Sequence, residues 1–176
     1  MLTVSQEIVI SNFAKELINR LSEAIRNKPL ARTSVRYVNG ERVTNNFSAT
    51  ANTTGKSIRS LSYEITNEAL IIKGEESIFT LIHGRKPTRE SGTGSVRDAI
   101  RDWVRAKGIV SDDISEESLV FLIARKIHRE GSSIYIRNNG GNSGLLTSVL
   151  NEQVLNDFNS KFTAQLIKEF EQELGD

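Results

Sequence analysis

Residues 5–27 read SQEIVISNFAKELINRLSEAIRN, and apolar side chains recur in this segment every three or four positions. This spacing places them along one face of an α-helix, so the segment predicts a long amphipathic helix. Ser5 is the expected N-cap, and Pro29 ends the helix because the residue before a proline avoids helical backbone angles. The apolar stripe consists of Ile10, Phe13, Ala14, Leu17, Ile18, Leu21, Ala24 and Ile25.

Two β-hairpins are predicted after this helix. Asn39-Gly40 favours a type I′ turn, which predicts a hairpin over residues 31–44. Residues 45–54 are rich in Asn, Thr and Ser, bury little, and are expected to form a loop or an arm. A helical turn over residues 56–60 precedes the second hairpin, residues 61–72, whose apolar return strand 69–72 is expected to be buried.

The rest of the chain is predicted to be mainly helical. Residues 95–108 and 115–131 form a helix pair, and residues 119–124 are apolar nearly all round, which is typical of a central helix. Residues 132–144 have the composition of a flexible loop. The last helix spans about residues 145–174 and is about 45 Å long, so part of it should project or pack on another subunit.

These elements predict a single α+β domain over residues 1–176. Its parts are a long N-terminal helix, a small mainly antiparallel sheet, an inserted helix pair and a long C-terminal helix. The interruptions are an arm at 45–54, the helical insertion at 95–131 and a flexible loop at 132–144.

Composition excludes several kinds of chemistry. The 176 residues include no Cys and only two His, so cysteine-based sites and multi-His metal sites are excluded. The apolar runs are too short to span a bilayer, and the first residues lack the features of a secretory signal. We therefore expect a protein of a reducing cytosol that is not an enzyme, has no cofactor and does not contact membranes.

The net charge of +1 hides an uneven distribution along the chain. Residues 83–108 hold seven basic and three acidic side chains, whereas residues 151–176 hold two basic and six acidic ones. This pattern is typical of a nucleic-acid contact, of a subunit that meets an acidic face, or of helix faces in solvent. The candidate assembly or DNA-channel contacts are Arg85, Lys86, Arg89, Arg97, Arg101, Arg105, Arg125, Lys126 and Arg129.

Other candidate chemistry is weak. Residues 91–95, SGTGS, precede a helix as a phosphate-binding loop does, but they lack the lysine of a P-loop. His83 and His128 have no Ser or acidic partner at local spacing, which argues against a hydrolytic dyad. Arg97, Arg101 and Arg105 recur every four residues and so form one helical stripe, the best candidate for a polyanion or an acidic partner.

Three stretches carry a family resemblance. The first is Thr54–Leu61, TGKSIRSL, with the following hairpin Ser62–Lys73. The second is Ile78–Pro87, IFTLIHGRKP, similar to a family strand that ends in a polar residue, Gly and a basic residue. The third is the helix pair Ala99–Ile109 and Leu119–Gly131. Together they resemble the tail-completion proteins of tailed bacteriophages, which are also called neck or head–tail joining proteins.

The resemblance implies a structural virion protein, assembled in the host bacterial cytoplasm. Copies would form a ring at the head–tail interface between portal or adaptor proteins and tail-tube proteins. The basic residues would line a DNA channel or meet acidic faces of neighbouring subunits. Two alternatives stay open: a nucleic-acid-binding accessory protein that uses the arginine stripe, and a tail terminator or other virion assembly protein.

Overall fold

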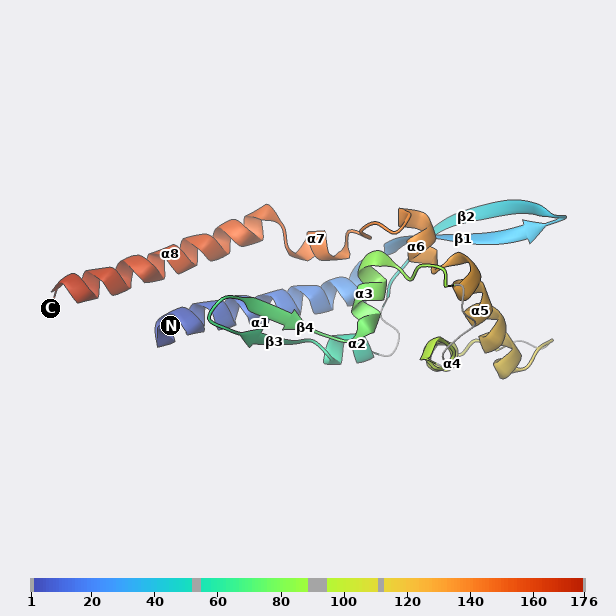
Figure 1. Ribbon diagram of the computed structural model, residues 1–176, viewed down its shortest axis with the longest axis horizontal. Coiled ribbons are helices and arrows are strands. Elements are labelled where there is room, and N and C mark those ends of the chain that lie inside the picture. The colour runs from blue at the N-terminus through green and yellow to red at the C-terminus, as the bar shows by residue number, and fades with distance from the viewer. Residues whose placement is uncertain (1, 52–54, 89–94, 111–112, 176) are drawn as a thin grey trace.

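The computed structural model describes residues 2–51, 55–88, 95–110 and 113–175. The chain forms an elongated α+β molecule with a long helix near each terminus (Figure 1). In chain order the elements are α1 (Val4–Asn27), β1 (Leu30–Val38), β2 (Glu41–Ala49), α2 (Lys56–Arg59), β3 (Ser62–Ile65), β4 (Leu70–Lys73), α3 (Glu76–His83), α4 (Ser95–Lys107), α5 (Glu116–Glu130), α6 (Ser133–Asn138), α7 (Leu145–Val149) and α8 (Glu152–Gly175).

The predicted α+β class is confirmed, and the strands lie in two separate antiparallel sheets of two strands each. In the β1–β2 hairpin, Asn39 and Gly40 have φ angles of 51° and 85°, as the predicted type I′ turn requires. The prediction of a loop from residue 45 is wrong as far as Ala49, which pairs with Leu30. Cross-strand pairing satisfies the backbone of this polar segment. Residues 52–54 lie outside the described residues.

The N-terminal helix α1 forms as predicted, but Thr3 and not Ser5 is its N-cap. The Thr3 hydroxyl accepts a hydrogen bond from the Gln6 amide, and the Gln6 side chain accepts one from the Thr3 amide, both at 3.2 Å. This reciprocal pair is a capping box, which satisfies two backbone donors at once. Ser5 therefore lies inside the first turn.

Two predictions about the middle of the chain are wrong. The return strand β4 is mostly exposed: both strands of its hairpin contact α1, but Ile71 and Ile72 of β4 face solvent. The stretch that resembles a family strand from Ile78 forms helix α3 instead. Ile78 and Ile82, four residues apart, lie on one face of that helix and are both buried.

Three predictions about the C-terminal half also need correction. Helix α5 is peripheral, because it buries Val120 and Ala124 but leaves Phe121 and Leu122 about half exposed. Residues 133–138 of the predicted loop form helix α6, which buries Ile134. The last helix is divided into α7 and α8 by residues 150–151.

The main hydrophobic core lies where α1 meets α3, α6 and α7 near the middle of the molecule (Figure 1). The C-terminal half of α1 contributes Leu21 and Ile25, and β1 contributes Leu30. The elements on either side of this crossing project away from it. The remaining members of the cluster are Ile78, Ile82, Ile134, Leu145 and Val149.

Gly84 ends α3 close to the backbone of α6. Its φ angle is +74°, and a Cβ atom there would lie 2.3 Å from the Tyr135 backbone nitrogen. The neighbouring Arg85 amide donates to the Ser132 hydroxyl at 2.9 Å, and the Ser132 amide donates to the Arg85 carbonyl at 2.8 Å. The absence of a side chain at residue 84 is what allows this junction to close.

We expect Gly84→Ala to lower the free energy of unfolding by about 3 kcal/mol or more, because it combines a left-handed φ with a backbone clash. Gly108→Ala is the matched control, since Gly108 also has a positive φ but a methyl group added there would meet no atom within 4 Å. That variant should lose only about 1–2 kcal/mol. Urea unfolding monitored by circular dichroism measures both, and equal losses would contradict the role of close approach.

Glu169 joins the distal half of α8 to the beginning of α1. Its carboxylate accepts hydrogen bonds from Gln165 Nε2 at 2.9 Å, Thr3 Oγ1 at 2.8 Å and Gln6 Nε2 at 2.6 Å. These hydrogen bonds lower the pKa of Glu169 below its ordinary value, with that from Gln165 the largest cause. Closer to the core, Phe13 stacks on Phe158 with ring centroids 4.2 Å apart.

We expect acid to loosen the contact between α8 and α1. The pKa of Glu169 is lower in the folded state than in the unfolded chain, so its stabilising contribution is present at neutral pH and is lost as pH falls through the folded value. Amide hydrogen exchange of α8, corrected for intrinsic rates, should therefore rise as the solution is acidified through that value. Glu169→Gln should raise exchange at neutral pH and remove this pH dependence; unchanged exchange would contradict the role of the carboxylate.

Candidate assembly surfaces

The arginine stripe of α4 lies against acidic side chains of α5. Arg101 binds Glu117 in a bidentate manner, with Nε–Oε1 and Nη2–Oε2 distances of 2.7 and 3.1 Å. Arg105 Nε lies 2.8 Å from Glu116 Oε1, and Arg97 Nη2 lies 3.4 Å from Glu117 Oε2. The predicted stripe therefore exists, but its charges are largely balanced within the subunit.

Two further basic residues fasten α5 to the β1–β2 hairpin. The Lys126 ammonium group donates a hydrogen bond to the Val35 carbonyl. The Arg129 guanidinium group pairs with Glu130 and lies over the Tyr37 ring, 5.8 Å from its centroid. These two candidate contacts have structural roles that their positions in the sequence did not reveal.

Three predicted contact residues keep their charges available. The side chains of Arg85, Lys86 and Arg125 form no ion pair with any residue that the structure describes. Lys86 and Arg125 are exposed, and Arg125 lies on the outer face of α5. Arg89, the remaining candidate, and the glycine-rich segment 91–94 lie outside the described residues.

The two histidines do not form a catalytic arrangement within the described part of the chain. His83 is exposed at the end of α3. His128 Nδ1 lies 2.5 Å from Thr88 Oγ1, while the Thr88 amide donates to the His128 carbonyl at 2.8 Å. His128 Nε2 is buried without a partner among the described residues, so no described carboxylate orients the ring. The Thr88 contact ties the segment after α3 to α5.

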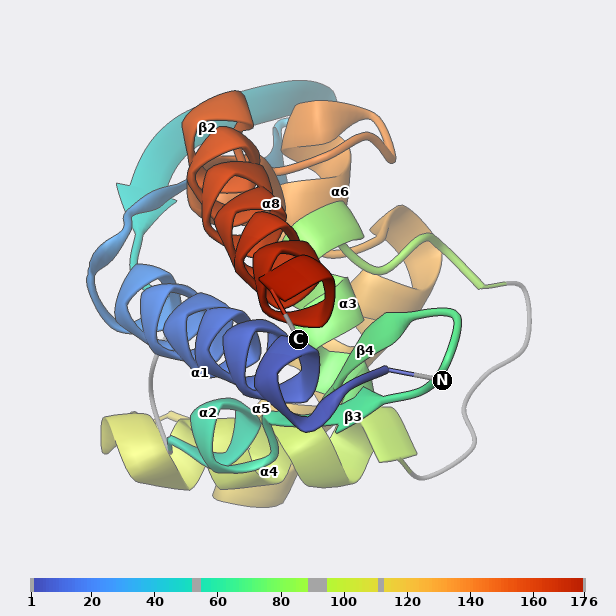
Figure 2. The same ribbon diagram turned by 90° about the vertical axis from the view of Figure 1, so that its left-hand side faces the viewer.

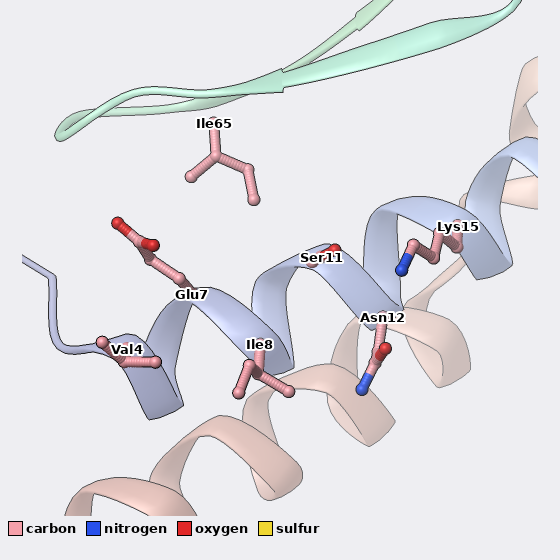
Figure 3. A pocket seen from close by; sticks show the side chains of 7 residues that line it. All are labelled: Val4, Glu7, Ile8, Ser11, Asn12, Lys15 and Ile65. Atoms are coloured by element: carbon pink, nitrogen blue, oxygen red, sulfur yellow. The ribbon is translucent and has the colours of Figure 1, made fainter.

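A groove of about 340 Å³ runs along the first half of α1 beside the β3–β4 hairpin (Figure 3). Ile65 of β3 overhangs it, and α1 supplies apolar side chains together with Glu7 and Lys15. Ser11 Oγ is already bonded to the Tyr63 hydroxyl at 2.7 Å. The residues that line the groove include no nucleophile with an adjacent base.

The molecule exposes far more surface than a compact monomer of its mass. Its accessible area is 11,818 Å². A compact protein of 19.6 kDa has about 8,600 Å², so the excess is about 3,200 Å². Among the described residues, 20 large hydrophobic side chains are exposed, against 15 buried hydrophobic residues. Composition alone gave no sign of this apolar surface, which depends on how the elements are arranged.

Comparison with protein-family models, curated proteins and solved structures finds no match for this chain. No helix within the described ranges has the length and apolarity needed to cross a bilayer. Nor do the described residues contain a group of three or more Asp, Glu, His or Cys side chains arranged to hold a metal ion.

We expect Arg101→Ala to loosen α4 from α5, because it removes a bidentate ion pair and the contact with Asp98. Hydrogen exchange of α4 amides should rise about two- to fivefold. Arg97→Ala, which removes a single 3.4 Å ion contact and the contact with the Phe121 ring, is the matched control and should have a smaller effect. If Arg97→Ala loosened α4 as much as Arg101→Ala, the bidentate pair would not be the main ionic contact.

The Arg101–Glu117 ion pair predicts that the contact between α4 and α5 depends on pH. The hydrogen bond from Arg101 lowers the pKa of Glu117 below its usual range. Its contribution to the α4–α5 contact is therefore present at neutral pH and disappears as pH falls through the lowered value. Nuclear magnetic resonance titration of the Glu117 carboxyl carbon measures this pKa, and Arg101→Ala should raise it. A pKa that stayed the same in Arg101→Ala would contradict this assignment.

Proposed function

We propose that this chain is a head–tail joining subunit, that is, a tail-completion or neck protein, of a tailed bacteriophage virion. In this role, copies form a ring between the portal or adaptor side of the neck and the tail tube. The observation that carries the proposal is the excess of about 3,200 Å² of accessible surface, together with 20 exposed large hydrophobic side chains among the described residues of an elongated subunit. Such a surface is typical of a protein that is completed by its neighbours.

The order of elements supports the same role. A short helix and a hairpin follow Gly55, and a helix pair is inserted before the final segments, as the resemblance implies. Residues from Ile78 form helix α3 and not the expected strand. This stretch therefore supports the resemblance by its sequence alone and not by its structure. A structural role also accounts for the positions of the histidines, one exposed and one bonded to Thr88.

The nucleic-acid-binding alternative receives less support from the charges. The stripe of Arg97, Arg101 and Arg105 lies against Glu116 and Glu117, and each phosphate contact would have to compete with these ion pairs. A role in lining a DNA channel falls instead to Arg85, Lys86 and Arg125. Among the described candidates, these three have neither an ion pair nor a side-chain hydrogen bond, whereas Lys126 donates a hydrogen bond to the Val35 carbonyl.

The decisive experiment removes the gene from the phage genome that encodes it and supplies it again from a plasmid. We expect filled heads and normal-length tails that stay separate in electron micrographs, with joining restored by the plasmid copy. Tails of uncontrolled length would identify a tail terminator instead. Normal virions without the protein would overturn the proposal.

A further inference from the structure

The outer face of α8 is apolar and acidic at its distal end. Ile167, Phe170 and Leu174 are 53%, 63% and 87% exposed, and their spacing places them on one side of the helix. The opposite side is occupied, because Phe158 and Glu169 contact α1. The exposed row is therefore not needed to hold α8 in place. Acidic residues beside it, Glu171 and Glu173, pair with no described residue.

The outer face of α5 also combines exposed apolar side chains with a charged neighbour, but the charge is positive. Phe121 and Leu122 are 47% and 49% exposed, and Arg125 follows one turn later on the same side. Val120 and Ala124 on the inner face of α5 are buried, and α5 packs on α4. Arg97 lies 5.8 Å from the Phe121 ring centroid, but its charge is already paired with Glu117, so Arg125 supplies the positive charge of this face.

These two faces cannot meet within one subunit. The distal end of α8 and helix α5 lie at opposite ends of the long axis (Figure 1). Figure 2 looks along that axis, with the end of α8 nearest the viewer and α5 behind the body of the molecule. An apolar face flanked by acids and an apolar face flanked by bases are thus held apart, each open to another molecule.

We propose that the distal face of α8 (Ile167, Phe170 and Leu174) docks on the outer face of α5 (Phe121, Leu122 and Arg125) of a second copy of this chain. The apolar side chains supply the buried centre, and Glu171 and Glu173 approach Arg125 at the rim. A stable interface buries about 800 Å² on each partner, so two such faces per subunit fit within the excess surface.

This contact is head-to-tail, because each copy uses a different face toward each neighbour. Such an interface forms a ring when its rotation closes. The inference deepens the proposed function, on which it rests for the expectation of a closed ring.

The experiment breaks one face at a time in the full chain. Phe170→Asp damages the α8 face and Leu122→Asp the α5 face; both side chains are exposed, so folding should be unaffected. We expect the wild-type chain to assemble in light-scattering measurements and each variant alone to be a monomer of about 19.6 kDa. An equal mixture should give a dimer and nothing larger, because only one intact α8 face and one intact α5 face remain.

Phe79→Asp is the matched control. Phe79 is 65% exposed on α3, outside both faces, so this variant should keep the wild-type mass. A second measurement uses the absence of cysteine from the chain. A mixture of Leu174→Cys and Leu122→Cys proteins should form a disulfide-linked heterodimer on mild oxidation, whereas Leu174→Cys with Glu41→Cys should not.

Several results would overturn this interface. They are a monomeric wild-type chain, wild-type mass for either Asp variant alone, no dimer in the mixture, or loss of assembly in Phe79→Asp alone. The gene-removal experiment is independent of them. Unjoined heads and tails together with unaffected Asp variants would reject the interface and keep the function. A mixture that dimerises as expected, from a gene that virions do not need, would reject the function and keep the interface.

Discussion

The structure depends on one crossing, where the C-terminal half of α1 packs on α3, α6 and α7. Leu21 and Ile25 are almost fully buried there, and Gly84 allows the α3 terminus to approach the α6 backbone. A core of this size cannot cover helices of 24 residues, each about 36 Å long. The ends of the molecule must therefore project, and the exposed apolar surface is a direct consequence of how little chain the crossing can enclose.

Polar contacts determine how the projecting parts lie. Glu169 bonds the same two residues, Thr3 and Gln6, that form the capping box of α1, so the beginning of α1 and the end of α8 are ordered together. At the other end, Lys126 donates to the β1 carbonyl of Val35. Several basic residues that the sequence predicts to contact partners, among them Arg101 and Lys126, instead bind groups of the same chain and position its elements.

Local signals in the sequence predicted most elements but not their environments. The Asn39-Gly40 turn and the long amphipathic helix follow from backbone preference and periodicity, which are local properties. The partners of Arg101 depend on how α4 packs against α5, and spacing along α4 cannot reveal it. Local patterns were wrong in two places: residues 119–124 predict a central helix although Phe121 is about half exposed, and residues 132–144 predict a loop although residues 133–138 form helix α6 and bury Ile134. In each case tertiary packing decided which apolar groups were covered.

The projecting ends are already ordered, and this affects the free energy of association. The stack of Phe13, Phe158 and Phe162 and the Glu169 hydrogen bonds hold α8 beside α1 before any partner arrives. Binding then requires little additional loss of conformational entropy, so a modest apolar face can give a useful affinity. The acidic end of α8 and the basic face of α5 favour head-to-tail contacts between copies. Contacts between two identical ends are disfavoured, because like charges repel. In the proposed assembly, this uneven charge would set the orientation of neighbouring copies, and the net charge of +1 hides it.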